Sequence, residues 1–137
     1  MTAFVDTNIF LRFLTRDDPE KAEACQTLFQ RARSGEADLV TSESVIAEVV
    51  FVLSSPRLYD LSRQDIRARL YPLLTLPGLR LPQRETCLHA LELYAAFPVD
   101  FEDALTTAHM HRQNIAELYS YDKDFDRLPN VNRIEPL

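Results

Sequence analysis

The chain has 137 residues, of which 46% are hydrophobic and 26% are charged, a composition typical of a single globular domain. Fifteen Lys and Arg residues against 21 Asp and Glu residues give a net charge of −6, which argues against binding of nucleic acid through a broad basic face. Only 2 glycines are present and no glycine-rich phosphate loop can be written, which excludes the nucleotide-binding classes built on such loops.

The predicted elements alternate between strands and helices along the chain. We expect strands at residues 3–5, 37–42, 78–82, 116–122 and 131–137. We expect helices at residues 8–15, from Asp17 or Asp18 to a stop at Gly35, then at 43–55, 62–74, 84–97 and 101–114, with a short helical turn within 123–129. This order predicts an α/β fold, a parallel sheet with helices on both faces, formed by residues 1–137 as one domain.

Several helix ends carry residues that favour capping. Besides Asp17 or Asp18, the expected N-caps are Ser42, Ser44, Ser62 and Asp100. The helix that begins near Pro19 has Ala24, Leu28 and Ala32 at intervals of four, which predicts one buried stripe.

The cysteines and the chain ends bear on the cellular compartment. Cys25 and Cys87 lie far apart without C-x-x-C partners, so we expect two reduced, buried thiols and neither a zinc site nor a disulfide framework. No signal peptide is visible, and no apolar run approaches the ~20 residues that span a bilayer. We therefore expect a cytoplasmic protein without membrane association.

Four acids occupy places where a carboxylate is unusual. Asp6 and Asp122 each end a predicted strand, Glu48 is the only charge inside "SVIAEVVFVL", and Asp103 lies in the first turn of a helix. Each also has a purely structural interpretation. Asp6 can cap a helix, Glu48 can lie on a solvated helix edge, Asp103 can form a capping box with Asp100, and Asp122 can open a turn.

The four acids together favour a metal site. If the strands that end in Asp6 and Asp122 are neighbours in a parallel sheet, both carboxylates emerge at the edge where such folds bind ligands. Glu48 and Asp103, on helices packed against that sheet, can lean into the same crevice. Clustered carboxylates repel one another unless a cation compensates them, and hard oxygen ligands suit Mg²⁺ or Mn²⁺. The chemistry indicated is metal-dependent hydrolysis of a phosphoester.

The three histidines add little to this interpretation. His109 and His111 are two residues apart on a helix, so they point in different directions and cannot chelate one ion from a single face. His89 stands alone. We expect all three in surface or partly buried roles.

Four segments resemble the motifs of one family, in order and over nearly the whole chain. The segments are "FVDTNIFLRFLTRDDPE", "TSESVIAEVVFVL", "DFEDALTTAHMHRQN" and "LYSYDKDFDRLPNVNRIEPL". They resemble the PIN-domain ribonucleases, especially the VapC toxins of bacterial toxin–antitoxin pairs. By this resemblance the metal-binding and catalytic acids are Asp6, Glu48, Asp103 and Asp122.

The resemblance implies a PIN fold, a Rossmann-like three-layer α/β/α sandwich around a central parallel sheet. It also implies a Mg²⁺- or Mn²⁺-dependent endoribonuclease that forms a homodimer and is neutralised by a cognate antitoxin. In such pairs a C-terminal segment of the antitoxin wraps the toxin and often places a basic residue in the acidic pocket.

The expected mechanism uses no protein nucleophile. The four acids would hold one or two divalent ions beside the scissile RNA phosphate, and a water activated by the metal would attack it. Thr7, Asn8 and Ser120 are expected to orient ligands or waters. Asp124 and Asp126 both lie close to Asp122 in sequence. Asp126 could assist through water and ranks below the four, and whether Asp124 assists Asp122 instead stays open. The candidate phosphate contacts are Arg12, Arg16, Arg57, Arg112 and Arg127.

Two other classes of function stay open. A different acid-site phosphohydrolase is one, but a haloacid-dehalogenase-type enzyme needs a second Asp where Asn8 stands. A receiver-like domain needs a Lys placed elsewhere than Lys123, directly after Asp122. The other class is a catalytically silent interaction module, against which the intact set of four acids argues.

Overall fold

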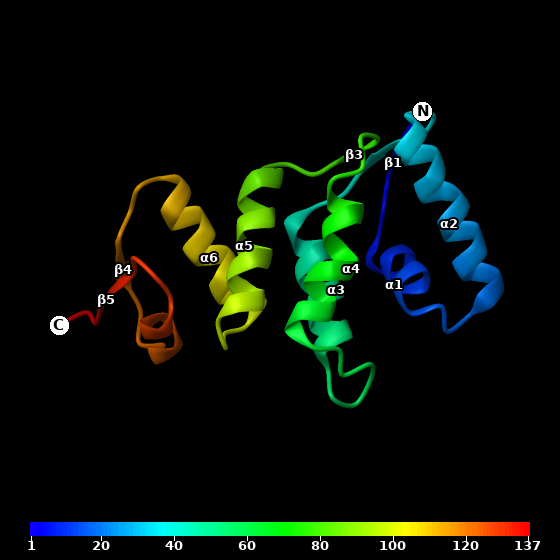
Figure 1. The fold of residues 1–137 in the computed structure, drawn as a ribbon. Helices are drawn as coiled ribbons and strands as arrows, with labels where there is room; N and C mark the ends of the chain where they lie inside the picture. Colours follow the sequence, from blue (N-terminus) through cyan, green and yellow to red (C-terminus); the bar gives the residue numbers. More distant parts are fainter. The chain divides into compact units, whose positions relative to one another are not determined.

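Strands and helices follow one another in the order that the sequence predicts (Figure 1). The strands are β1 (Thr2–Phe4), β2 (Asp38–Val40), β3 (Leu79–Arg80), β4 (Glu117–Tyr119) and β5 (Asn132–Ile134). The helices are α1 (Thr7–Thr15), α2 (Pro19–Ser34), α3 (Glu43–Ser54), α4 (Arg63–Leu74), α5 (Arg84–Ala96) and α6 (Phe101–Arg112), followed by the 3₁₀ helix η1 (Lys123–Arg127). This computed structural model describes all 137 residues and divides them into two units, 1–84 and 85–137.

All strand pairs are parallel, as predicted. In the first unit the order is β1-β2-β3, with Ala3 opposite Leu39 and Leu39 opposite Leu79. In the second unit β4 pairs with β5, and Leu118 lies opposite Arg133. Parallel neighbours require a crossover connection, which the helix pairs α1–α2 and α3–α4 supply in the first unit. The predicted α/β class with parallel strands is therefore confirmed.

The observed strands after β1 are shorter at both ends than the predicted ones, whereas helix ends agree within two residues. The extra predicted strand residues lie in caps and turns: Ser42 caps α3, and Ser120 accepts a hydrogen bond from the Asp122 amide in a tight turn. Four predicted N-caps accept the expected amide hydrogen bonds, namely Asp18, Ser42, Ser62 and Asp100. Ser44 is not a cap, because it lies inside α3.

The core of the first unit includes an aromatic cluster between α1 and α2. The Phe29 ring lies 5.5 Å from the Phe10 ring and 5.2 Å from the Phe13 ring, measured between centroids. This contact selects which face of α2 is buried: Ala22, Cys25, Phe29 and Ala32. The predicted stripe was wrong in two of its three members, because Ala24 is exposed and Leu28 only half-buried. Periodicity at intervals of four missed the face that the largest side chain of the helix determines.

Two backbone segments approach each other closely at Gly78, before β3. Its amide donates to the Ala32 carbonyl at 2.8 Å, and its carbonyl accepts from the Leu39 amide at 2.8 Å. A Cβ at this position would lie 2.4 Å from the Ala37 carbonyl oxygen and 2.5 Å from that of Ala32. Only glycine fits here, and it seats the end of α2 against β3.

The second unit packs α5, α6 and η1 around its own buried side chains. The Tyr94 and Phe101 rings meet edge to face with centroids 6.0 Å apart, and Phe125 and Leu128 anchor η1 and the residue after it. Both cysteines of the chain are buried and unbonded to each other, as predicted. No helix of the structure combines the length and apolarity needed to cross a bilayer.

Candidate functional site

Asp6 lies where β1 gives way to α1, at the N-cap position of that helix. Its carboxylate is exposed and makes no capping hydrogen bond, unlike those of Asp18 and Asp100. The structural interpretation of Asp6 as a side-chain cap is therefore not supported. The carboxylate stays available for another ligand.

The backbone before Asp6 is held by a residue that the sequence did not single out. Thr41 is 1% exposed, and its hydroxyl donates to the Val5 carbonyl at 3.1 Å. The Val5 amide donates to the Val40 carbonyl at 2.8 Å. These bonds fix the strand end that presents Asp6. Because this contact joins residues that are 36 apart in the chain, no local sequence pattern predicts it.

Thr7 and Asn8 open α1, and Glu48 lies on α3. Thr7 is half-buried, while the Asn8 and Glu48 side chains are exposed. Glu48 lies between the buried Ile46, two residues before it, and the buried Val49, and it is exposed on an otherwise apolar stretch of helix. Since α1 packs against α3, these residues belong to adjoining elements of the first unit.

Asp103 is the most perturbed carboxyl group of the second unit. Its amide donates to Asp100 Oδ1 at 2.8 Å, so the predicted capping contact exists. Its own Oδ2 is buried and has no hydrogen-bond partner. Burial raises the pKa of Asp103 to about 6, assisted by the negative charges of Asp100, Asp122 and Asp124. An unpaired buried oxygen beside other acids is a place where a cation would be favourable.

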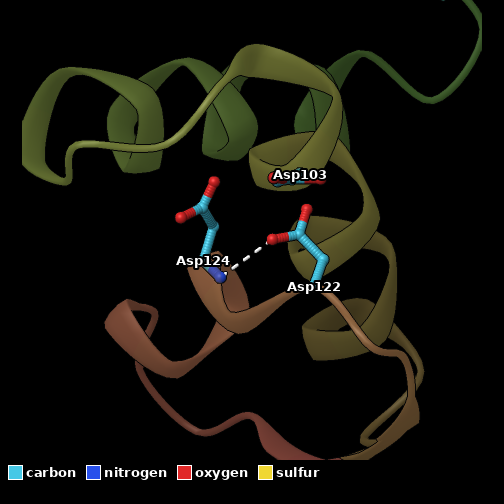
Figure 2. A group of neighbouring side chains, drawn as sticks. All are labelled: Asp103, Asp122 and Asp124. Atoms are coloured by element: carbon cyan, nitrogen blue, oxygen red, sulfur yellow. Dashed lines mark hydrogen bonds between the residues drawn. The ribbon is translucent and has the colours of Figure 1, made fainter.

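Three carboxylates converge in this unit, those of Asp103, Asp122 and Asp124 (Figure 2). One oxygen from each lies within 4.8 Å of the others. Asp122 caps η1 by accepting from the Asp124 amide at 2.9 Å, and the Asp122 amide donates to Ser120 Oγ at 3.0 Å. The structure thus brings Asp103 and Asp122 together. It adds Asp124, which the sequence left as an open alternative.

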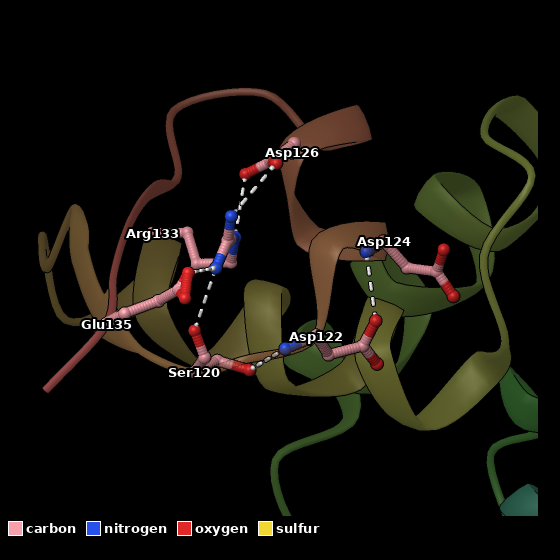
Figure 3. Close-up of polar contacts among 6 residues, drawn as sticks. All are labelled: Ser120, Asp122, Asp124, Asp126, Arg133 and Glu135. Carbon is pink, nitrogen blue, oxygen red and sulfur yellow. Dashed lines mark hydrogen bonds and ion pairs between the residues drawn. The ribbon is translucent and has the colours of Figure 1, made fainter.

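Asp126 points to a different partner. Its carboxylate pairs with the Arg133 guanidinium at 3.0 Å, and Arg133 also bonds Glu135 at 3.2 Å and the Ser120 carbonyl at 3.1 Å (Figure 3). Arg133 thus already neutralises this carboxylate, and water-mediated help from Asp126 stays a prediction. Through Arg133, Asp126 is linked to the Ser120 carbonyl, two residues before Asp122. Arg133 itself was missed, since its contacts with Asp126 and Ser120, 7 and 13 residues away, are made only in the fold.

Three of the candidate phosphate-binding arginines have partners within the chain. Arg12 pairs with Asp17 at 3.0 Å, and Arg16 donates to Gln26 at 2.7 Å. Arg127 pairs with Asp124 at 2.9 Å, at the edge of the carboxylate cluster. The other two candidates, Arg57 and Arg112, are exposed.

The donor set of the second unit fits a hard divalent cation. It consists of carboxylate oxygens alone, one of them buried without a partner. Such ligands suit Mg²⁺ and Mn²⁺ better than softer metals. Asp103, Asp122 and Asp124 would hold the ion. Asp6 and Glu48 belong to residues 1–84, while Asp103 and Asp122 belong to residues 85–137.

The raised pKa of Asp103 predicts that the metal-free protein loses stability as the pH rises. Between the ordinary value of 3.8 and about 6 the folded state binds the proton more tightly than the unfolded chain, so the free energy of unfolding falls across this range. The full shift corresponds to about 3 kcal/mol, and we expect about 1 kcal/mol because solvent screens this partly exposed group.

Urea denaturation in EDTA at about pH 4.5 and about pH 7.5, for wild type and Asp103→Asn, isolates this contribution from the other acids. The stability difference between the two proteins should shift in favour of the variant at the higher pH. An unchanged difference would assign Asp103 an ordinary pKa.

Comparison with known proteins identifies the family of the chain. A profile of the PIN domain matches residues 3–131. The VapC ribonuclease of Aquifex aeolicus is 26% identical over 124 residues, 90% of each chain, and Ribonuclease VapC13 of Mycobacterium tuberculosis is 29% identical over 133 residues, 95% of this chain and 97% of that protein. The crystal structure of Mycobacterium tuberculosis VapC20, a toxin that cleaves the sarcin–ricin loop, aligns over 90% of this chain and 92% of its own with 21% identity and a TM-score of 0.40. Because the profile match covers nearly its whole length, this chain belongs to the PIN-domain family.

Proposed function

We propose that this chain is a divalent-cation-dependent endoribonuclease and the toxin of a type II toxin–antitoxin pair. The proposal is supported by membership of the PIN-domain family and by relatives named VapC ribonucleases that align over 90% or more of the chain.

The observation that carries the proposal is the cluster of Asp103, Asp122 and Asp124. Its carboxylate oxygens lie within 4.8 Å of one another, and the buried Asp103 Oδ2 has no partner. Without a cation, such a cluster costs free energy through repulsion and desolvation. A bound divalent cation would offset this cost, which is why the cluster supports a metal site.

We further propose that residues 1–137 form one PIN domain in which Asp6 and Glu48 complete the site. Asp6 supports this because its carboxylate has no capping role, and Glu48 because it is the one exposed acid of an apolar helix segment. Thr7 and Asn8 flank Asp6 and would orient water or substrate there. We propose Asp122 as the fourth metal ligand, after Asp6, Glu48 and Asp103, with Asp124 beside it.

A divalent cation, when bound, neutralises the scissile phosphate and lowers the pKa of a water molecule. The residues of the chain position this chemistry. Ser120 holds the Asp122 backbone, and Arg127 restrains one oxygen of Asp124. Arg57 and Arg112, which are exposed, are the arginines of the candidate set most available to RNA phosphates.

The proposed partners follow from the relatives. A toxin of this class would be neutralised by a cognate antitoxin protein, and we propose a homodimer as the active form. The site of action would be the cytoplasm, where the RNA substrate is found.

Removal and return of the metal tests the activity. We expect labelled RNA to be cleaved in Mg²⁺ or Mn²⁺, to stay intact in EDTA, and to be cleaved again when the ion is restored. If RNA stays intact under all metal conditions, the interaction module is the better interpretation. Cleavage that persists in EDTA would instead reject the cation-dependent mechanism.

Asp6→Asn tests the part of the site in the first unit, with Asp18→Asn as its matched control. Both residues are helix N-caps, but only the Asp18 side chain makes the capping bond. We expect Asp6→Asn to abolish cleavage without loss of thermal stability, and Asp18→Asn to leave cleavage intact because Asn also caps well. Undiminished cleavage by Asp6→Asn would remove Asp6 from the mechanism.

A further inference from the structure

Two histidines of the second unit form a contact that the sequence did not predict. His89 Nε2, from α5, lies 2.9 Å from His111 Nδ1, from α6, with the ring centroids 5.2 Å apart. The other nitrogen of His111, Nε2, lies 2.8 Å from the Pro129 carbonyl oxygen. His111 therefore bridges a neighbouring helix and the segment that follows η1.

The Pro129 carbonyl determines where the protons of this chain lie. A carbonyl oxygen only accepts, so His111 Nε2 must carry a hydrogen. In neutral His111 the Nδ1 atom then has a free lone pair, which accepts from a hydrogen on His89 Nε2. The pair can take up one proton without losing the contact. In that state His111 is charged and donates from Nδ1, while His89 is neutral, carries its hydrogen on Nδ1 and accepts at Nε2. A second proton would place hydrogens on both facing nitrogens and break the contact.

The bridge ties together the two elements that carry the acidic cluster. α6 presents Asp103 in its first turn and His111 in its last. Pro129 lies just after η1, whose start carries Asp122 and Asp124. Apolar burial of Leu128 anchors the same segment, and the next residue but one, Asn130, has a left-handed backbone with φ 59°. A polar tie at Pro129 limits how far this strained segment can move away from α6.

We propose that His111 is a positioning residue for the metal site: it holds the Pro129 segment on α6 so that Asp122 and Asp124 stay opposite Asp103. His89 fixes the tautomer in which His111 can do so. This inference rests on the proposed function, because it assumes that the cluster binds a cation. No contact between either histidine and the cation is involved.

Charges around the pair influence when the contact is lost. Burial lowers the pKa of His89, and the charge of His111 lowers it further. The charge of Glu92, on the same helix, raises the pKa of His89. The contact should persist while the pair holds at most one proton and weaken when the second proton binds at lower pH.

The test measures Mn²⁺ binding to metal-free full-length protein by electron paramagnetic resonance of the free ion. His111→Leu removes the donor to Pro129, while His111→Gln keeps an N–H that can reach the same carbonyl. We expect His111→Leu to weaken Mn²⁺ binding about 10-fold, as loss of a supporting contact does, and His111→Gln to restore most of the affinity. Equal losses in both variants, or none in either, would overturn the proposal.

Two further readouts separate positioning from packing. ¹⁵N chemical shifts of wild type should show the His111 hydrogen on Nε2, and a hydrogen on Nδ1 alone would overturn the bridge. Affinity for Mn²⁺ should fall more steeply toward acid pH in wild type than in His111→Gln. Both proteins have the same carboxylates, so this difference reports the histidine pair. Parallel pH profiles would count against a role for the pair. If wild type fails to bind Mn²⁺ at all, the metal site itself is rejected, whereas normal binding by His111→Leu rejects only the role of His111.

Discussion

Asp103→Asn should abolish RNA cleavage and at the same time make the metal-free protein more stable. Loss of a contact that merely supports a metal ligand lowers activity or affinity about 10- to 100-fold, so loss of an oxygen that we propose as a ligand should lower activity more than about 100-fold. Stability should change in the opposite direction, because the substitution removes a charge that is half-buried beside Asp122 and Asp124. At about pH 7.5 without metal we expect a gain of about 1 kcal/mol.

The measurement combines cleavage of labelled RNA with urea denaturation in EDTA. Glu102→Gln is the matched control, since Glu102 is the exposed neighbour in the same helical turn and lies outside the cluster. The control should keep both activity and stability near the values of wild type. A variant at Asp103 that lost stability as well as activity would indicate a structural role for this carboxylate in place of a cation site.

Gly78→Ala should cost about 3 kcal/mol of folding free energy, the upper end of what overpacking usually costs. The added methyl group would meet two backbone carbonyl oxygens, of Ala37 and Ala32, at 2.4 and 2.5 Å. Neither oxygen can rotate away as a side chain would. Relief would require moving β2 or the end of α2, whose bonds to Gly78 hold β3 in place.

The only other glycine provides the control. Gly35 has φ +83° at the C-cap of α2 and has open space around an added Cβ. Gly35→Ala therefore tests backbone strain without a clash, at an expected cost of about 1 kcal/mol. Urea denaturation of both variants compares the two effects directly. Equal losses would mean that the close approach at Gly78 relaxes more easily than its geometry indicates.

The element order was accessible from the sequence because local signals determine it. Asp18, Ser42, Ser62 and Asp100 each mark a helix start through a bond to an amide three residues ahead, a signal contained in a short stretch of chain. Together with the alternation of strands and helices, these signals predicted the α/β class, and family membership confirms the PIN-like fold. Strand ends were less accessible, because the same polar residues serve turns and caps.

The supporting residues of the site were not accessible in this way. Thr41, after β2, bonds Val5, after the neighbouring β1. His111 on α6 contacts His89 on α5 and Pro129 in the segment after η1. Such contacts join residues far apart in the chain and leave no periodic trace. The structure groups Asp124 with Asp103 and Asp122 and pairs Asp126 with Arg133, two arrangements that the sequence did not distinguish. The roles of Asp6, Glu48, Asp103 and Asp122 as metal ligands stay predictions.

The hydrogen bonds around Asp122 and Asp124 have a consequence for the choice of ion. Asp122 Oδ1 accepts from the Asp124 amide, and Asp124 Oδ1 accepts from Arg127, so each carboxylate has one oxygen already committed. The other oxygen of each residue accepts neither of these bonds and is the one more available to a cation, which favours one ligand oxygen from each carboxylate. Ca²⁺ favours six to eight oxygen ligands and readily takes both oxygens of a carboxylate, whereas Mg²⁺ needs only a compact octahedron completed by water. A cation site built on this turn would match the water-completed octahedron of Mg²⁺ better than the many-oxygen shell of Ca²⁺, and we expect Mg²⁺ to compete well against Ca²⁺ here.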